Sequence, residues 1–66
     1  MYRLYVKFTE DKRFKPVDWS RGVQVSNLIH ATLFTEKERD QLIAVDLSHP
    51  DNSEIEWQFR QVNGIG

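Results

Sequence analysis

The sequence predicts an α+β domain: a small two-layer structure in which a three- to four-stranded, mostly antiparallel sheet carries one helix on one face. Three observations predict it. Residues 2–8 and 54–62 alternate between apolar and polar side chains, as half-buried strands do. Between them, Thr35 and Glu38 have the spacing of a capping box, which opens a helix. The expected order is strand, strand, strand, helix, strand.

Residues 2–8 form the first expected strand. Side chains point alternately to the two faces of a strand, so its odd and even positions separate into two sets. One set is apolar and should face the helix: Tyr2, Leu4, Val6 and Phe8. The other set should lie on the outer face of the sheet: Arg3, Tyr5 and Lys7.

Residues 9–12, TEDK, are turn-forming and predict a hairpin. The returning segment, residues 13–17, contains Pro16, which has no backbone N–H to donate. Proline restricts such a segment to an edge strand or to an extended loop, and both interpretations stay open.

Residues 18–22 indicate a loop in which Gly22 is free to adopt a positive φ. Residues 23–25 fit either the start of a strand or half a helical turn. Trp19 lies in the loop, so it either covers the small core or presents an anchor to a partner, and the need for core coverage favours the first.

Residues 28–34, LIHATLF, are expected to form a central strand. In an extended conformation both faces would be mostly apolar, which is typical of a strand covered on both sides. Seven residues is an ordinary length for a strand and short for a helix. His30 inside this run is interpreted as a partly buried histidine that hydrogen-bonds a neighbour.

A helix is expected over residues 36–47. Glu36 and Glu38 lie in its first turn, where the helix dipole favours negative charge. Asp46 interrupts the apolar stripe, which predicts fraying before that residue. Pro50 ends the helix, because the residue before a proline avoids the α region.

The last expected strand, residues 54–62, directs Ile55, Trp57 and Phe59 toward the helix. If it is adjacent and parallel to residues 28–34, the helix between them is a right-handed crossover. Residues 63–66, NGIG, are expected to be a flexible tail, so the domain is residues 1–62.

Composition argues against several functions. The chain of 66 residues has no cysteine and only two histidines without ligand spacing, so no metal site is expected. It has no nucleophile elbow and no glycine-rich phosphate loop, and its acidic helix start is interpreted as a solvated face. We therefore expect no catalytic residues, no cofactor and no enzymatic activity. No apolar run approaches the roughly 20 residues that span a bilayer, and the start resembles no signal peptide, so a cytoplasmic protein without membrane contact is expected.

A basic and aromatic segment, residues 12–21, is the best candidate binding surface. Cations that contact phosphates and rings that stack on bases are what single-stranded nucleic acid requires. The sequence pI near 6.0 argues against this, and Arg3 and Lys7 could pair with Glu54 or Glu56 across strands. A solvated face is therefore the favoured interpretation. The segment's candidate residues are Lys12, Arg13, Phe14, Lys15, Trp19 and Arg21.

The charge is unevenly distributed, although the net charge is only −1. Residues 1–30 carry six Lys/Arg and three acids, whereas residues 31–66 carry three Lys/Arg and seven acids. The function remains unknown, and the leading hypothesis is a non-enzymatic binding or accessory module that contacts an unknown protein partner or a second copy of itself. Unpaired edge strands at residues 13–17 or 2–8 are the expected contact. The alternative is single-stranded nucleic-acid binding through residues 12–21.

The stretches NLIHATLFTEKE and EIEWQFRQV resemble small uncharacterised proteins carried by bacterial mobile elements such as phages and conjugative transposons. The resemblance covers roughly the second half of the chain. It implies a bacterial cytoplasmic setting and an accessory binding role, and it assigns no residue a function.

Overall fold

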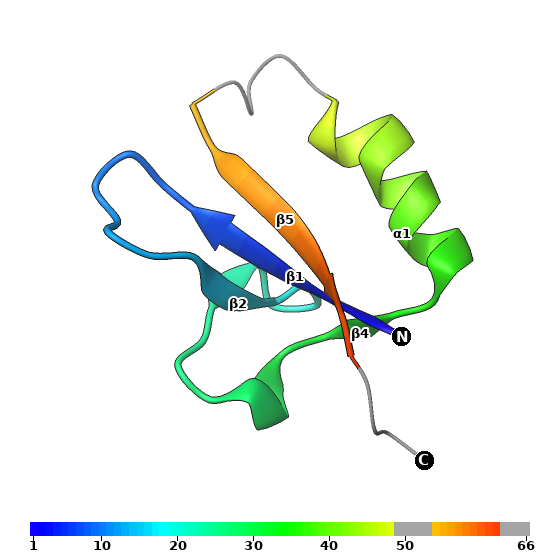
Figure 1. Ribbon diagram of the computed structural model, residues 1–66, viewed down its shortest axis with the longest axis horizontal. Coiled ribbons are helices and arrows are strands. Elements are labelled where there is room, and N and C mark those ends of the chain that lie inside the picture. The colour runs from blue at the N-terminus through cyan, green and yellow to red at the C-terminus, as the bar shows by residue number, and fades with distance from the viewer. Residues whose placement is uncertain (49–53, 63–66) are drawn as a thin grey trace.

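Strand β1 (Tyr2–Lys7) is the centre of the sheet in the computed structural model, which describes residues 1–48 and 54–62. Along one side it pairs over its whole length with β5 (Glu56–Gln61). On its other side, β2 (Lys15–Asp18) pairs with one half and β4 (Leu33–Phe34) with the other. All these pairings are antiparallel, and Figure 1 shows β1 and β5 running side by side.

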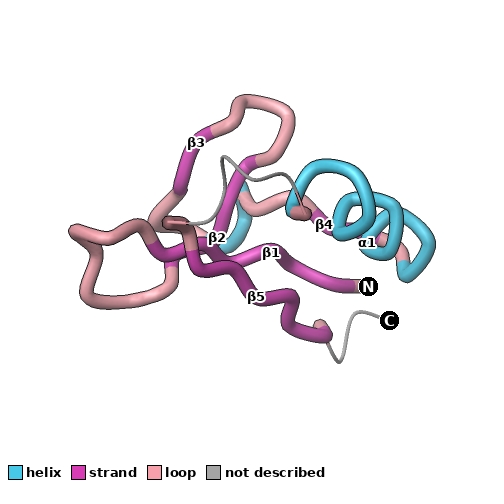
Figure 2. The backbone as a smooth tube through the Cα atoms, turned by 90° about the horizontal axis from the view of Figure 1, so that it is seen from above, coloured by secondary structure: helices cyan, strands magenta, loops and turns pink. Residues whose placement is uncertain are grey.

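The remaining strand, β3 (Val23–Gln24), pairs with β2 alone. The sheet order is therefore β3–β2–β1–β4, with β5 on the other side of β1. Seen from above, β3 and β5 lie at opposite margins with β1 between them (Figure 2). The α+β class and the antiparallel sheet are confirmed. Two strands of only two residues each bring the sheet to five strands.

The helix begins where the capping box predicts. The Thr35 side chain accepts the Glu38 backbone N–H, and the Glu38 carboxylate accepts the Thr35 N–H at 3.0 Å. Helix α1 (Glu36–Leu42) continues directly into η2 (Ile43–Leu47), a stretch of wider π-type turns. The helical region therefore covers residues 36–47 as expected, and the predicted fraying before Asp46 is wrong. No helix in the described part of the chain is long and apolar enough to cross a membrane.

The core lies between the sheet and the helix. Leu4 and Val6 of β1 are buried, and Leu42 is the one buried residue of α1. Phe8 departs from the expected inward-facing set: it follows the end of β1 and is 38% exposed. The core is completed by Val17 and Phe34, with Tyr2, Leu47, Ile55, Trp57 and Phe59 packed around it.

Pro16 fits inside β2 because its backbone groups point away from β1, where an N–H donor would otherwise be needed. The Val25 N–H donates to the Pro16 carbonyl at 2.9 Å, so the backbone of Pro16 points toward the β3 side. Neighbouring residues in an antiparallel pair alternate in direction, so β1 requires no donor from this position. The proline is accommodated in a strand that has neighbours on both sides.

Most of the expected strand at residues 28–34 is absent. Leu28–His30 forms a 3₁₀ turn, η1, and only β4 is extended. The Asn27 side chain accepts the Ile29 N–H at 3.1 Å, which gives the backbone a local alternative to strand pairing. Ile29 is 79% exposed, and His30 is exposed rather than partly buried.

Two expectations about strand neighbours are also corrected. Strands β4 and β5 are each antiparallel to β1, which lies between them, so no adjacent parallel pair with a crossover helix forms. Neither proposed edge is free, because β1 is central and β2 has a strand on each side. Among the described residues, β3, β4 and β5 each have one unpaired side. Pro50, which was expected to end the helix, and the expected tail at residues 63–66 lie outside the described residues.

Candidate binding groove

An apolar groove of about 150 Å³ opens at the end of the sheet where β1 ends and β5 begins. We call it the apolar groove. Its floor includes the buried side chains of Val6 and Val17. Its rim is formed by exposed apolar residues, Phe8, Trp19 and Val23, which are 38%, 40% and 44% exposed. The remaining lining residues are Gly22, Gln24, Leu47, Ile55 and Trp57.

The turn after β2 holds Trp19 at the rim. The Asp18 carboxylate accepts the Ser20 hydroxyl at 2.7 Å and the Arg21 N–H at 3.3 Å, and these bonds lower the pKa of Asp18, the Ser20 bond most strongly. Gly22 closes the turn by donating its N–H to the Trp19 carbonyl. Its φ is 67°, so the positive φ expected from the sequence is confirmed.

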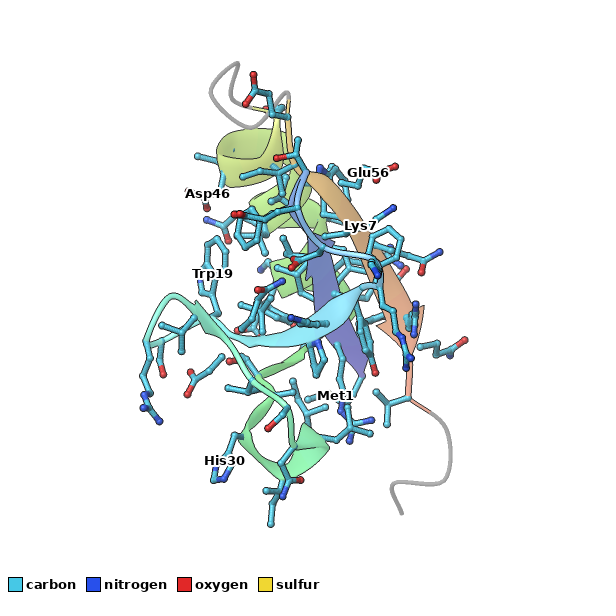
Figure 3. The ribbon with its side chains drawn as sticks, turned by 90° about the vertical axis from the view of Figure 1, so that its left-hand side faces the viewer. Met1, Lys7, Trp19, His30, Asp46 and Glu56 are labelled. Carbon is cyan, nitrogen blue, oxygen red and sulfur yellow. The ribbon has the colours of Figure 1, made fainter. Side chains whose placement is uncertain are left out.

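The Trp19 backbone N–H donates to the Thr32 hydroxyl oxygen at 2.8 Å, so both the N–H and the C=O of Trp19 are hydrogen-bonded. Trp19 and Lys7 lie toward opposite sides of the sheet (Figure 3). The indole separates the apolar groove from a second, more polar hollow against the helix, which includes Leu42 and Val45. With two-fifths of its surface exposed, Trp19 is available to a partner while it borders the core.

The polar side chain of Gln24 is already hydrogen-bonded. Its Nε2 donates to the Val6 carbonyl and to the Asp11 carboxylate, both at 3.0 Å. The Gln24 hydrogen bond is the main reason that the pKa of Asp11 lies below its ordinary value. An occupant of the groove would therefore meet apolar surface and few unsatisfied polar groups.

The described residues that line the groove include no carboxylate, histidine, lysine or hydroxyl group. Acid–base and nucleophilic catalysis both need such a side chain at the site. Among residues 1–48 and 54–62, no three His, Cys, Asp or Glu side chains gather where they could hold a metal ion. The arrangement is suited to binding by apolar contact.

The six candidate residues of segment 12–21 do not form one surface. Trp19 lines the apolar groove, whereas the ring of Phe14 lies 5.9 Å from the guanidinium of Arg60 on β5. Two cations are already paired: Lys15 with Asp11 at 3.6 Å, and Arg21 with Asp18 at 3.9 Å.

Lys12 and Arg13 are exposed and form no ion pair within the described residues. They are thus the two cations of segment 12–21 that are left for a phosphate backbone. The rings of the segment lie apart from each other: Trp19 lines the apolar groove, whereas Phe14 lies near Arg60.

The outer face of the sheet carries Arg3, Tyr5 and Lys7. The Lys7 ammonium pairs with Glu56 of β5 at 3.4 Å, one of the cross-strand pairs expected from the sequence. The Arg60 guanidinium lies 4.1 Å from the centre of the Tyr5 ring, at cation–π distance. Arg3 has no acidic partner in the described chain, and its Nε is buried without a hydrogen bond.

The acidic helix start has structural roles. Glu38 belongs to the capping box, and its bonds with Thr35, the backbone N–H first, lower its pKa. Arg39 bonds Asp40 at 2.8 Å and pairs with Glu36 at 3.7 Å. These contacts occupy the three carboxylates.

The sequence did not indicate the apolar groove, because its lining comes from β1, β2, β3, η2 and β5 together. The available signal was Trp19 in a polar loop. No protein-family model matches the chain, and neither a curated protein nor a solved structure matches it.

Proposed function

We propose that the protein is a small non-enzymatic binding module that takes one large apolar side chain of a protein partner into the apolar groove. The observation that carries the proposal is the groove itself: about 150 Å³, apolar in lining, with exposed aromatic rims. A bacterial cytoplasmic accessory role belongs to the same proposal, and the absence of cysteine supports a reducing compartment.

The volume selects the kind of ligand. Cofactors and drug-sized metabolites occupy pockets of about 300–1,000 Å³, whereas an apolar cavity of about 150 Å³ holds a single benzene-sized group. A groove of that size accommodates the side chain of one leucine, methionine or phenylalanine. The rest of a peptide would extend over Trp19 into the hollow beside Val45, which is itself 64% exposed.

A peptide-display selection against the immobilised protein tests the proposal. The selected peptides should share one large apolar residue, and its replacement by alanine should abolish most binding. Trp19→Ala should weaken the selected peptides about tenfold or more, as expected for loss of an aromatic anchor. Ile29→Ala is the matched control, because it removes a more exposed apolar side chain that does not line the groove.

If the selected peptides lack a shared apolar residue, or bind the Trp19→Ala variant as tightly as the original protein, the proposal is wrong. Backbone amide shifts recorded with a bound peptide give a second readout: they should move at Val6, Val17 and Val23 and stay unchanged at Ile29.

Single-stranded nucleic-acid binding through segment 12–21 is the alternative, supported by Lys12 and Arg13, which are exposed and form no ion pair with any described residue. Titration with short DNA and RNA oligomers in low salt tests it. Amide shifts at residues 12–15 that disappear as salt rises would favour this alternative over the groove.

A further inference from the structure

Strand β5 leaves one side unpaired among the described residues, and its backbone directions are fixed by the ladder with β1. The Val62 N–H donates to the Met1 carbonyl at 2.9 Å, and Tyr2 lies opposite Gln61. Hydrogen-bonding direction alternates along an antiparallel strand. The N–H and C=O groups of Gln61, Phe59 and Trp57 therefore point away from β1, toward the open side.

No described strand or helix covers the open side. In Figure 2, β5 forms one margin of the molecule, with β1 between it and both β2 and α1. The strand is six residues long and has no proline. An open edge of this length can template another strand, which natural proteins often prevent with charged side chains.

The charged side chains of β5 are placed so that they can pair with those of a second β5 strand. Glu56 and Arg60 lie on the outer face, two residues on either side of Gln58. In an antiparallel pair of two β5 strands related by a two-fold axis at Gln58, Glu56 of each copy is opposite Arg60 of the other. No other two-fold register that keeps the faces aligned sets these two charges opposite each other.

The same register supplies what the outer face lacks. Arg3 lies directly opposite Arg60 in the β1–β5 ladder, and neither forms an ion pair with an acid in residues 1–48 and 54–62. Like charges opposite each other destabilise a sheet. Glu56 of the second copy would lie beside Arg60 and bring a carboxylate to this pair of arginines.

The inner face is complementary as well. Trp57 and Phe59 already contact each other edge to face at 6.1 Å, and both are only partly buried. In the register centred on Gln58, Trp57 of one copy is opposite Phe59 of the other. Aromatic cross-strand pairs are among the stabilising ones, and these two positions carry the outward backbone groups that exchange hydrogen bonds.

We infer that a second copy of this chain docks on the open edge of β5, forming a two-fold dimer with a continuous sheet centred on Gln58. The inference concerns a surface other than the rim of the apolar groove. Trp19→Ala, which weakens groove binding, should leave the dimer unchanged, so the two proposals fail separately.

Charge exchange provides the test. Sedimentation equilibrium of the original protein should show a concentration-dependent monomer–dimer equilibrium. Glu56→Arg and Arg60→Glu should each weaken it about tenfold or more, because two unlike pairs become two like pairs. An equimolar mixture of the two variants should form a heterodimer more tightly than either variant dimerises alone, since both pairs between the copies are again unlike. Lys37→Glu, on the exposed side of the helix, is the control and should change nothing.

Three results would overturn the inference: a monomer at every concentration, dimerisation that neither exchange weakens, or two weakened variants that do not associate when mixed. Heterodimer formation also demonstrates that both variants fold. A second measurement uses the absence of cysteine from the chain. Gln58→Cys should form a disulfide-linked dimer under mild oxidation, and Lys37→Cys should not; equal rates for the two would contradict the register.

Discussion

Replacing Leu42 by alanine should remove much of the domain's stability. Leu42 is the one buried residue of α1, at 6% exposure, and it joins Leu4, Val6 and Phe34 in the core. Truncating a buried leucine to alanine costs about 3 kcal/mol in typical cores, within a range of about 2–5. A domain of this size has roughly 3–10 kcal/mol of unfolding free energy in total. The change therefore threatens folding itself.

Urea unfolding followed by far-ultraviolet circular dichroism measures the effect. With a slope of about 1–3 kcal/mol per molar urea, a loss of about 3 kcal/mol lowers the midpoint by roughly 1–3 M. Val45→Ala is the control from the same helical region: Val45 is 64% exposed, so its truncation should change stability by no more than about 0.5 kcal/mol. Equal midpoints for the two variants would refute the packing of the helix on the sheet.

Two further predictions concern local contacts. Thr35→Ala removes the capping hydroxyl and should lower the unfolding free energy by about 1 kcal/mol, whereas Thr35→Ser should retain it; urea unfolding of both variants checks this. The pKa values of Asp11, Asp18 and Glu38 are lowered by hydrogen bonds from Gln24, Ser20 and Thr35. The unfolded chain, with ordinary pKa values, binds more protons in acid. The melting temperature should therefore hold above about pH 5 and fall as the pH drops toward about 3, and Asp18→Asn should reduce that fall.

The elements that could be predicted from the sequence are those whose signal is local. Alternation set the positions of β1 and β5, and the spacing of Thr35 and Glu38 set the first residue of α1. Each signal depends on side chains within one turn or one strand, so no knowledge of the rest of the chain was needed. The fraying expected before Asp46 is wrong, because the helix continues as wider π-type turns from Ile43 to Leu47.

The segment before the helix was misjudged for a different reason. The apolar run at residues 28–34 fits a strand by length and composition, but the Asn27 side chain stabilises a 3₁₀ turn and turns Ile29 outward. Periodicity cannot weigh one side-chain hydrogen bond against strand pairing. The exposed position of His30 follows from the same turn.

The candidate site could be predicted only in part. Trp19 was noted as either a cover or an anchor, and it lies at the rim of the apolar groove with 40% of its surface exposed. The rest of the groove depends on which strands become neighbours, which composition does not encode. Sequence order places Phe14 near Trp19, but in the structure Phe14 lies near Arg60 of β5 and Trp19 lines the apolar groove.

We propose that the apolar groove binds one apolar side chain. The most direct test is to titrate the protein with blocked single amino acids and to measure the chemical shifts of its backbone amides. N-acetyl-phenylalanine amide should produce saturable shifts at Val6, Val17, Trp19 and Val23, and N-acetyl-glutamate amide should produce none. Shifts that are absent with both, or that are equal for both, would contradict the account.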